Sequence, residues 1–383
     1  MRLMVSCGEP SGDLYAGALA AEILRKEPSA EIVGFGGDRL AAAGARLLEN
    51  FSGLSVTGLS EVVRLLPRTY ATYRRLVEDA EAHRPDVFVA IDFPDFNFVL
   101  ARALKKRGIP VVYYISPQLW AWRSGRMATM KRLVERVLVI FPFEEQIYRD
   151  AGVAVEWVGH PLFDVAPSTT PRPAFLQGLG MDPARPVLAL LPGSRTNELH
   201  AILPDLVGAT RLIREQVPGV QFLLARAPHL RDELLAPVTN RDPRTPSIVV
   251  VDGQADNVLA AADAAVVASG TVTVQAALHR CPMAVVYRLS PMTYRLGKPF
   301  VRVETYAMPN LVAGRRVVRE LIQDDLTPGA VAAEAVRMLT SREYATRMRA
   351  DLREVAEKLG TKGASGRAAD AVLSVARRHA RVG

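Results

Sequence analysis

The sequence predicts an α/β protein with two domains, each built on a parallel sheet wound between helices. Short runs of β-branched residues alternate with helical patterns along the chain, as in successive βα units. At 383 residues, the chain exceeds the size at which one hydrophobic core usually keeps growing. A stretch with three prolines, Val165–Pro173, separates two series of βα units and marks a linker.

Strands are predicted where short apolar runs lie between turn residues. In the first series they cover residues 2–6, 31–35, 87–91, 111–115, 136–140 and 155–158, and in the second series residues 187–191, 221–225, 247–251, 264–268 and 283–287. We therefore expect a first domain at 1–165, a linker at 166–173 and a second domain at 174–340. The two sheets are expected to face each other across a cleft.

Helical patterns fill the last segment, residues 341–383. Ser341 is a suitable N-cap, Gly360 is a helix stop, and residues 368–379 form an amphipathic segment. We expect these helices to pack either on the first domain or on a second subunit of a homodimer. The sequence leaves both arrangements, and hence the oligomeric state, open.

Composition places the chain among folded proteins, with 49% apolar and 23% charged residues. Cys7 and Cys281 are the only cysteines and lie far apart, which fits a reducing compartment and argues against a disulfide scaffold or a cysteine metal site. The N-terminus has no signal-peptide pattern, and no run of ~18 apolar residues occurs. We expect a cytoplasmic protein.

The formal charge of +8 predicts attraction to an anionic partner: nucleic acid, phospholipid headgroups or phosphorylated substrates. The sequence contains no recognisable nucleic-acid module and no basic run interleaved with aromatic residues. Lipid surfaces and phosphates are therefore the favoured partners.

Two carboxylates, Asp92 and Asp95, directly follow the apolar strand at 87–91. Ligands of wound α/β proteins bind at the carboxyl ends of strands, and Pro94 makes this turn rigid. A carboxylate placed there can take a proton from a substrate. The alternative is that Asp92 only caps the helix expected to begin near Phe96.

Three strand-to-helix turns in the second half are candidates for binding phosphate. The turn at Ser269–Thr271 exposes backbone N–H groups at a helix start, and Arg195 follows another strand with a fork suited to a diphosphate. Asn310 lies in the third turn, as a helix cap or a ligand contact. Each turn alone is also a common helix cap, but three at one sheet edge favour a nucleotide diphosphate. The loop motifs of ATP hydrolysis and dinucleotide redox enzymes are missing from the sequence.

Eight motifs occur in the order seen in one enzyme family: Gly8–Asp13, Ile91–Asn97, Tyr114–Trp122, Phe141–Glu144, Val158–Pro161, Leu191–Arg195, Ala268–Thr271 and Met308–Gly314. In number, order and spacing, they resemble the lipid-A-disaccharide synthases over almost the whole chain. The resemblance implies the GT-B fold, with two Rossmann-like domains. It also implies a hexosyltransferase that moves 2,3-diacylglucosamine from its UDP donor to 2,3-diacylglucosamine 1-phosphate (lipid X). The products are UDP and the β-1,6-linked lipid A disaccharide 1-phosphate.

On the acceptor side, the resemblance makes Asp92 the base of an inverting displacement, with Glu9 as the next acid in line. Further substrate contacts are expected at three neighbouring positions, namely Ser11, Asp95 and Asn97.

On the donor side, Arg195 and the amides at Ser269, Gly270 and Thr271 would stabilise departing UDP. Asn310 would lie near the donor, and Gln275 would contact the ribose. The family usually has Glu at position 275, whereas Gln offers one acceptor oxygen and an NH2 donor, so ribose binding is expected to be weaker or differently arranged. No metal or other cofactor is implied.

A segment of the first domain has the composition of a helix that lies on a membrane surface. Leu59, Val62, Val63, Leu66 and Tyr70 are among the residues of an apolar stripe, and Arg64 and Arg68 lie off it. Pro67 is expected to split the segment into two pieces. The hypothesis is that the enzyme is peripheral on the cytoplasmic face of the inner membrane and that this segment guides acyl chains. The alternative is an ordinary amphipathic helix packed on the sheet.

The other candidate residues have structural interpretations. His160 is expected to be a structural hydrogen-bonding residue, and Trp120 and Trp122 to anchor a turn. Two other functions remain open at this point: a UDP-N-acetylglucosamine epimerase of the same fold, and a non-catalytic nucleotide-sugar-binding protein.

Overall fold

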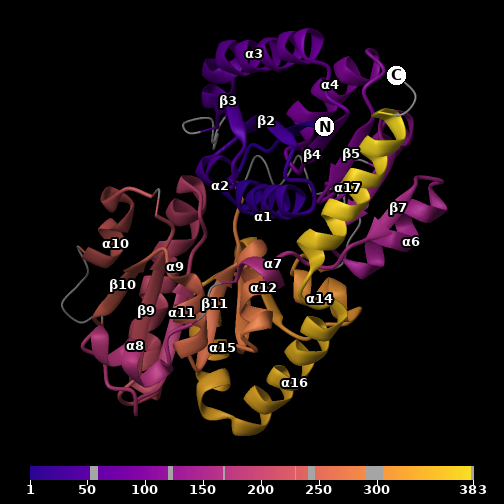
Figure 1. Ribbon diagram of the computed structural model, residues 1–383. Helices are drawn as coiled ribbons and strands as arrows, with labels where there is room; N and C mark the ends of the chain where they lie inside the picture. Colours follow the sequence, from indigo (N-terminus) through magenta and orange to yellow (C-terminus); the bar gives the residue numbers. More distant parts are fainter. Residues whose placement is uncertain are drawn as a thin grey trace. The chain divides into compact units, whose positions relative to one another are not determined.

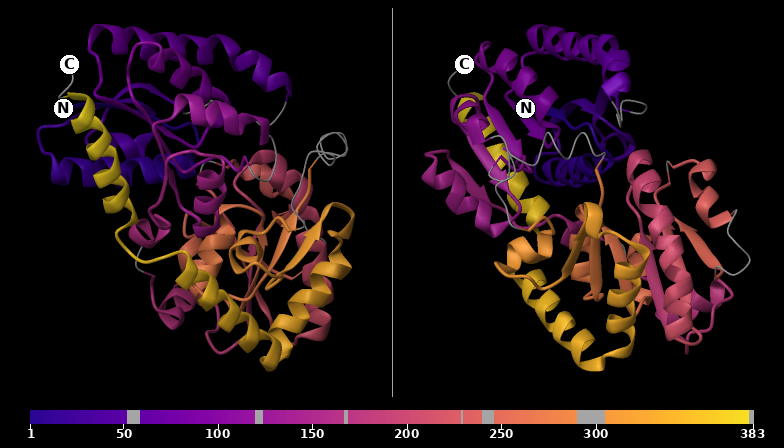
Figure 2. Two further views of the ribbon diagram at one scale, coloured as in Figure 1. Left: turned by 90° about the vertical axis from the view of Figure 1, so that its right-hand side faces the viewer. Right: turned by 180° about the vertical axis from the view of Figure 1, so that it is seen from behind.

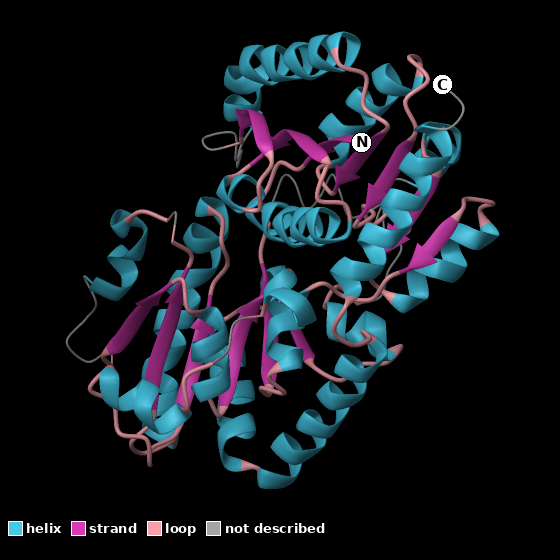
Figure 3. Ribbon diagram, viewed as in Figure 1, coloured by secondary structure: helices cyan, strands magenta, loops and turns pink. Residues whose placement is uncertain are grey.

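The computed structural model describes residues 1–51, 59–119, 124–166, 169–228, 230–239, 246–289 and 305–380, and for residues 59–65 and 124 it describes the backbone alone. The chain divides into two compact units (Figure 1). Unit 1 contains Met1–Ala166 and Leu359–Gly383, and unit 2 contains Pro167–Lys358. Each unit is a parallel sheet with helices packed on it (Figure 3), so the predicted fold class is confirmed.

Unit 1 has a seven-stranded sheet in the order β3-β2-β1-β4-β5-β6-β7, with every neighbouring pair parallel. Its strands are β1 (Arg2–Ser6), β2 (Glu31–Gly36), β3 (Arg46–Asn50), β4 (Val87–Ile91), β5 (Val111–Tyr114), β6 (Arg136–Val139) and β7 (Val155–Trp157). Its helices are α1 (Pro10–Lys26), α2 (Asp38–Ala42), α3 (Leu59–Ala82), α4 (Pro94–Lys105), α5 (Met127–Leu133), α6 (Pro142–Asp150), α7 (Leu162–Val165) and α17 (Ala364–Ala380), with a 3-10 turn η1 (Ser124–Arg126).

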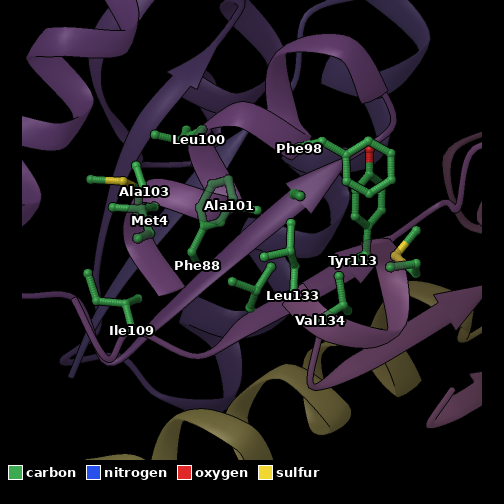
Figure 4. Close-up of a cluster of buried hydrophobic side chains, with 14 of the residues drawn as sticks. Met4, Phe88, Phe98, Leu100, Ala101, Ala103, Ile109, Tyr113, Leu133 and Val134 are labelled. Carbon is green, nitrogen blue, oxygen red and sulfur yellow. The ribbon is translucent and has the colours of Figure 1, made fainter. Parts of the chain in front are cut away.

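The core of unit 1 follows from the two-residue period of its strands, which sends alternate side chains to opposite faces of the sheet. Met4, Phe88 and Tyr113 point to the face of α4 and α5, where they join Leu100 and Leu133 in one apolar cluster (Figure 4). Helix α17 packs on α1 and contacts β4 and β5 (Figure 2). This cluster holds the central strands rigid, and their carboxyl ends carry the candidate site.

Unit 2 has a six-stranded parallel sheet in the order β10-β9-β8-β11-β12-β13. Its strands are β8 (Val187–Leu191), β9 (Gln221–Arg226), β10 (Ile248–Asp252), β11 (Ala264–Ala268), β12 (Met283–Tyr287) and β13 (Arg319–Ile322). Its helices are α8 (Arg172–Gly178), α9 (Thr196–Gln216), α10 (Ala236–Thr239), α11 (Ala255–Ala261), α12 (Thr271–Leu278), α14 (Met308–Ala313), α15 (Pro328–Thr340) and α16 (Arg342–Lys358), with 3-10 turns η2 (Asp232–Leu235) and η4 (Gln323–Asp325).

The structure differs from the sequence prediction in three places. Strands β3 and β13 are additional; both are short edge strands with charged residues in place of an apolar run. Helix α3 continues through Pro67, so the expected break is wrong; position 67 is exposed, and the missing N–H costs one backbone bond on the solvent side. The two C-terminal helices divide between the units, with α16 in unit 2 and α17 in unit 1.

Two further features concern the helices themselves. The Ser341 hydroxyl accepts a hydrogen bond from the N–H of Tyr344 (3.3 Å), which is the predicted cap of α16. Among the helices in the described ranges, none combines the length and the apolar character needed to cross a bilayer.

Candidate active site

The chain leaves β4 through two consecutive residues with left-handed backbone, Asp92 (φ 44°) and Phe93 (φ 47°). Non-glycine residues in this conformation cost about 1–3 kcal/mol each and persist only where the surroundings hold them. Helix α4 begins at Pro94 with Phe93 as its N-cap residue, so Asp92 is not the N-cap residue that the alternative required. The position of the half-buried Asp92 is therefore set by the strand exit.

Asn97, a fully buried residue of α4, holds this strand exit in place. Its Nδ2 donates to the carbonyl oxygens of Asp92 (2.8 Å), Ser6 (3.3 Å) and Ile91 (3.3 Å). Its Oδ1 accepts from the Ser6 hydroxyl (2.7 Å), and the Tyr113 hydroxyl also donates to the Asp92 carbonyl (2.7 Å). The side chain of Asn97 thus faces the protein, and in place of the expected substrate contact it ties the end of β1 to the end of β4.

The loop after β1 lies beside the loop after β4, because the two strands are neighbours in the sheet. A Cβ atom on Gly8 would lie 2.5 Å from ring carbons of Phe93, so the two loops are in contact. Glu9 is the half-buried N-cap residue of α1, and Ser11 lies in the first turn. The two candidate catalytic acids, Glu9 and Asp92, therefore follow adjacent strand ends.

The pKa of the Cys7 thiol depends on the acidic residues around it. Burial raises the pKa of Cys7, and the charges of Asp13 and Asp92 raise it further. Asp13 is itself buried and accepts hydrogen bonds from three backbone N–H groups of residues 37–40, at 2.8–3.1 Å. Because all three donors lie at the start of α2, Asp13 is a structural anchor for that helix, a role that its place in the motif does not reveal.

Asp95 points away from this buried network. Its side chain is exposed and pairs with Arg126 (2.6 Å), whose guanidinium carbon lies 5.8 Å from the ring centroid of Phe98. Asp95 therefore remains an accessible candidate for a substrate contact.

His160 is a structural residue, as expected. It is 2% exposed, its Nδ1 accepts from the N–H of Leu162 (3.2 Å), and it lies edge-on to Tyr15 and Phe141. Burial lowers the pKa of His160 to about 3, so it stays neutral at physiological pH. Trp120 and Trp122 lie outside the described residues.

In unit 2, the exit of β11 leads into the first turn of α12. Gly270 has φ 154°, which favours glycine, and among the residues that the structure describes, its two chain neighbours apart, none has an atom within 4 Å of an ideal Cβ there. The first turn of α12 contains no acidic residue. Its leading N–H groups lack acceptors within the helix, so this turn has the open backbone of an anion site. The neighbouring Ser269 donates its N–H to Val286 (2.9 Å) and its hydroxyl to the carbonyl of Tyr306 (3.5 Å).

The turn after β8 carries its own carboxylate. Glu198 accepts from the N–H groups of Ser194 (2.9 Å) and Arg195 (3.2 Å) at the start of α9, and the Gly193 backbone (φ 118°) leaves room for it. An acid three residues after the N-cap position is a recognisable sequence signal. Arg195 is exposed. Burial and the charge of Glu198 raise the pKa of Tyr287 in β12, and the charge of Arg195 opposes this rise. Strands β8 and β11 are parallel neighbours. Arg195, which follows β8, and the first turn of α12, which follows β11, therefore come after adjacent strand ends.

Asn310, in α14, is 2% exposed and is used by the protein. Its Oδ1 accepts from the N–H groups of Val317 (2.7 Å) and Val318 (2.9 Å), and its Nδ2 donates to Glu320 (2.8 Å) and to the Val318 carbonyl (3.0 Å). Glu320 also accepts from the N–H groups at the start of α14. Asn310 therefore positions α14 beside β13, in place of the expected donor contact.

Gln275 lies one turn into α12 and is partly exposed. Its Nε2 donates to Asp256 Oδ2 (3.2 Å), a residue of α11 that the sequence does not single out. Gln275 therefore remains a candidate for the ribose contact, with its amide held from one side.

The expected membrane segment falls on α3. The side chains of Leu59, Val62, Val63 and Arg64 lie outside the described residues. Leu66 is 55% exposed and Tyr70 is 63% exposed, and Tyr70 stacks on Tyr73 with ring centroids 6.2 Å apart. Arg68 pairs with Glu49 (3.3 Å). The described part of α3 thus exposes two large apolar side chains one turn apart.

Comparisons with known proteins cover nearly the whole chain. The family model described as Lipid-A-disaccharide synthetase matches residues 3–375. The lipid-A-disaccharide synthase of Koribacter versatilis is 42% identical over 383 residues, which cover 99% of each chain. The lipid-A-disaccharide synthase of Myxococcus xanthus is 42% identical over 374 residues, 98% of this chain and 97% of the relative.

Solved structures agree at the level of the fold. A UDP-GlcNAc 2-epimerase from Neisseria meningitidis bound to UDP-GlcNAc has a TM-score of 0.69 at 13% identity and covers 98% of this chain and 100% of its own. The glycotransferase of kitacinnamycin has a TM-score of 0.65 at 19% identity, with 98% of both chains covered. The sequence matches go further than the fold: the chain belongs to the lipid-A-disaccharide synthetase family and is a glycosyltransferase of the GT-B fold.

Proposed function

We propose that the chain transfers 2,3-diacylglucosamine from UDP-2,3-diacylglucosamine to the 6-hydroxyl of 2,3-diacylglucosamine 1-phosphate, releasing UDP. The observation that carries this proposal is the exit of β4, where Asp92 is held by Asn97 and Tyr113. The backbone at Asp92 and Phe93 is left-handed and therefore strained. Such strain is typical of a functional residue whose exact position is required. The family match makes the epimerase and the non-catalytic alternatives unnecessary.

Asp92 serves as the general base in this reaction. The acceptor oxygen attacks the anomeric carbon from the face opposite UDP, and its proton passes to the Asp92 carboxylate as the new bond forms. The bond between the anomeric carbon and the UDP oxygen breaks in the same step. Configuration at the anomeric carbon is inverted, which gives the β linkage. Glu9 follows the adjacent strand end and is the alternative base.

The departing UDP carries the charge that unit 2 must stabilise. Of the three candidate turns, two have protein carboxylates on their N–H groups, Glu198 at α9 and Glu320 at α14. We therefore assign the diphosphate to the first turn of α12, at residues 269–271, with the Arg195 guanidinium as a second contact. Fixed N–H dipoles and a planar cation stabilise developing charge without having to move during the reaction.

The test of this assignment is Asp92→Asn, which keeps the size of the side chain and removes the base. We expect loss of UDP release in the presence of both sugar substrates, by about 10²–10⁴-fold, with UDP affinity unchanged in calorimetry. Glu9→Gln is the matched variant on the neighbouring loop and should lower turnover less. Retained turnover in Asp92→Asn together with loss in Glu9→Gln would move the base to Glu9.

The second part of the proposal concerns the membrane. Both substrates carry acyl chains, and we place the enzyme on the cytoplasmic face of the inner membrane with α3 as the contact. The exposed Leu66 and Tyr70 and the basic charge of the whole chain support this placement.

Replacing Leu66 and Tyr70 by serine should reduce sedimentation with anionic phospholipid vesicles while leaving the circular dichroism spectrum unchanged. Val99, on α4 and 49% exposed, provides the control, since Val99→Ser removes a similar exposed apolar side chain elsewhere. Equal vesicle binding by all three proteins would contradict a membrane role for α3.

A further inference from the structure

We propose that Asp256 is a positioning residue for the donor: it holds the amide of Gln275 so that the carbonyl oxygen of Gln275 accepts from a ribose hydroxyl of UDP. This inference rests on the proposed function, because it uses the donor site at the start of α12. It adds a residue from a different helix, and it assigns to Gln275 one of two chemically distinct orientations.

The contacts of Asp256 determine this orientation. Its Oδ2 accepts from Gln275 Nε2 (3.2 Å), and its Oδ1 lies 2.8 Å from His279 Nε2. A carboxylate only accepts hydrogen bonds, so the group of Gln275 that faces it is the NH2 and not the carbonyl oxygen. The same reasoning places the proton of His279 on Nε2. Both oxygens of Asp256 are thereby used, and the Gln275 carbonyl oxygen is left on the other side of the amide.

Helical geometry places Gln275 on the face of α12 that begins at the proposed diphosphate site. Thr271 and Gln275 of α12 and the C-cap residue His279 are spaced four residues apart and so share one face of the helix. Thr271 is the first residue of that face, at the proposed diphosphate site, His279 is the last, and Gln275 lies between them. A ribose bound next to the diphosphate would meet Gln275 within one helical turn.

Burial makes the arrangement rigid. The side chains of Asp256 and His279 are only 13% and 17% exposed, in the contact between α11 and α12. A glutamine amide that is anchored through its NH2 loses less rotamer freedom when the ligand binds than an unanchored one. Asp256 therefore prepares an acceptor of fixed direction at a position where glutamine alone would present either end.

The first test compares UDP with 2′-deoxy-UDP and 3′-deoxy-UDP in calorimetric titrations of the full chain. Wild type should bind UDP more tightly than at least one deoxy analogue, by about fivefold for one hydrogen bond. Asp256→Ala should reduce that ratio toward one, because the amide is no longer oriented. Asn257→Ala, at the next position of α11, changes a half-buried side chain that bonds to Thr170 and Gln254, and should leave the ratio unchanged.

The second test exchanges the two chemical groups. Gln275→Glu alone places a carboxylate against Asp256 and should weaken UDP binding through like-charge repulsion. Adding Asp256→Asn to Gln275→Glu places the NH2 group of asparagine against the new carboxylate, so that a hydrogen-bond donor again faces an acceptor. The double variant should therefore recover UDP affinity and the deoxy-analogue ratio. A purely structural role of Asp256 would not restore the ratio.

The outcomes separate this inference from the proposed function. If wild type binds UDP and Asp256→Ala keeps the wild-type ratio, the positioning role is wrong and the donor site stands. The positioning role is also wrong if Gln275→Glu alone binds UDP more tightly than wild type. If wild type does not bind UDP, the proposed function fails, and this inference fails with it.

Discussion

Replacing Asn97 by alanine should destabilise unit 1 and disable the active site together. The variant leaves the fully buried Ser6 hydroxyl without its acceptor and removes the amide donor from the Asp92 carbonyl. An orphaned buried polar group costs about 1–3 kcal/mol and a lost hydrogen bond about 1 kcal/mol, so we expect a loss of about 3 kcal/mol. For a unit of this size, that loss lowers the Tm by about 6–12 °C.

Tyr113→Phe provides the matched comparison. It removes one hydrogen bond to the same Asp92 carbonyl, which keeps its bond to Asn97, so the cost should be about 1 kcal/mol. Differential scanning calorimetry measures both variants, and turnover measured alongside should fall more for Asn97→Ala because the left-handed exit at Asp92 loses its main support. A Tm of Asn97→Ala at or above that of Tyr113→Phe would refute this account of the loop.

Three further predictions concern unit 1. In the folded state the pKa of His160 is about 3, whereas in the unfolded chain it is about 6.5. The unfolded chain therefore takes up a proton that the folded state does not, and the free energy of unfolding falls as the pH drops. Between pH 7.5 and 5.5 we expect a loss of about 1.4 kcal/mol. Urea unfolding at both pH values should show this loss in wild type but not in His160→Asn, and equal losses would contradict it. Asp13→Ala, which removes the acceptor of three N–H groups, should lower the urea midpoint more than Asp13→Asn, and the reverse order would argue against the anchor. Gly8→Ala should lower the free energy of unfolding by about 1–3 kcal/mol, because the added methyl group overlaps the ring of Phe93. The double variant with Phe93→Leu should recover part of this loss. If the effects of the two substitutions simply add, the two loops do not touch.

Much of the fold follows from local patterns in the sequence. Strands such as Val87–Ile91 and Ala264–Ala268 are continuous apolar runs between turn residues, as strands covered on both faces require, and their predicted bounds match the structure. The edge strands β3 and β13 escape this reasoning. Their residues are largely charged or half-buried, and only the presence of β2 and β12 beside them makes them strands.

The candidate site divides in the same way. The sequence by itself determined where polar residues and glycines interrupt the strands, because the carboxyl ends of parallel strands collect such residues at one edge. Which of those side chains are instead buried and hydrogen-bonded within the protein was decided only by the tertiary structure. Asn97 and Asn310 have the side chains of binding residues, yet both are buried and hydrogen-bonded to the protein. Conversely, Asp256 has no sequence signal, because its partner lies on another helix. Periodicity is local and can be read along the chain, whereas burial and hydrogen-bond partners depend on residues brought together only by folding.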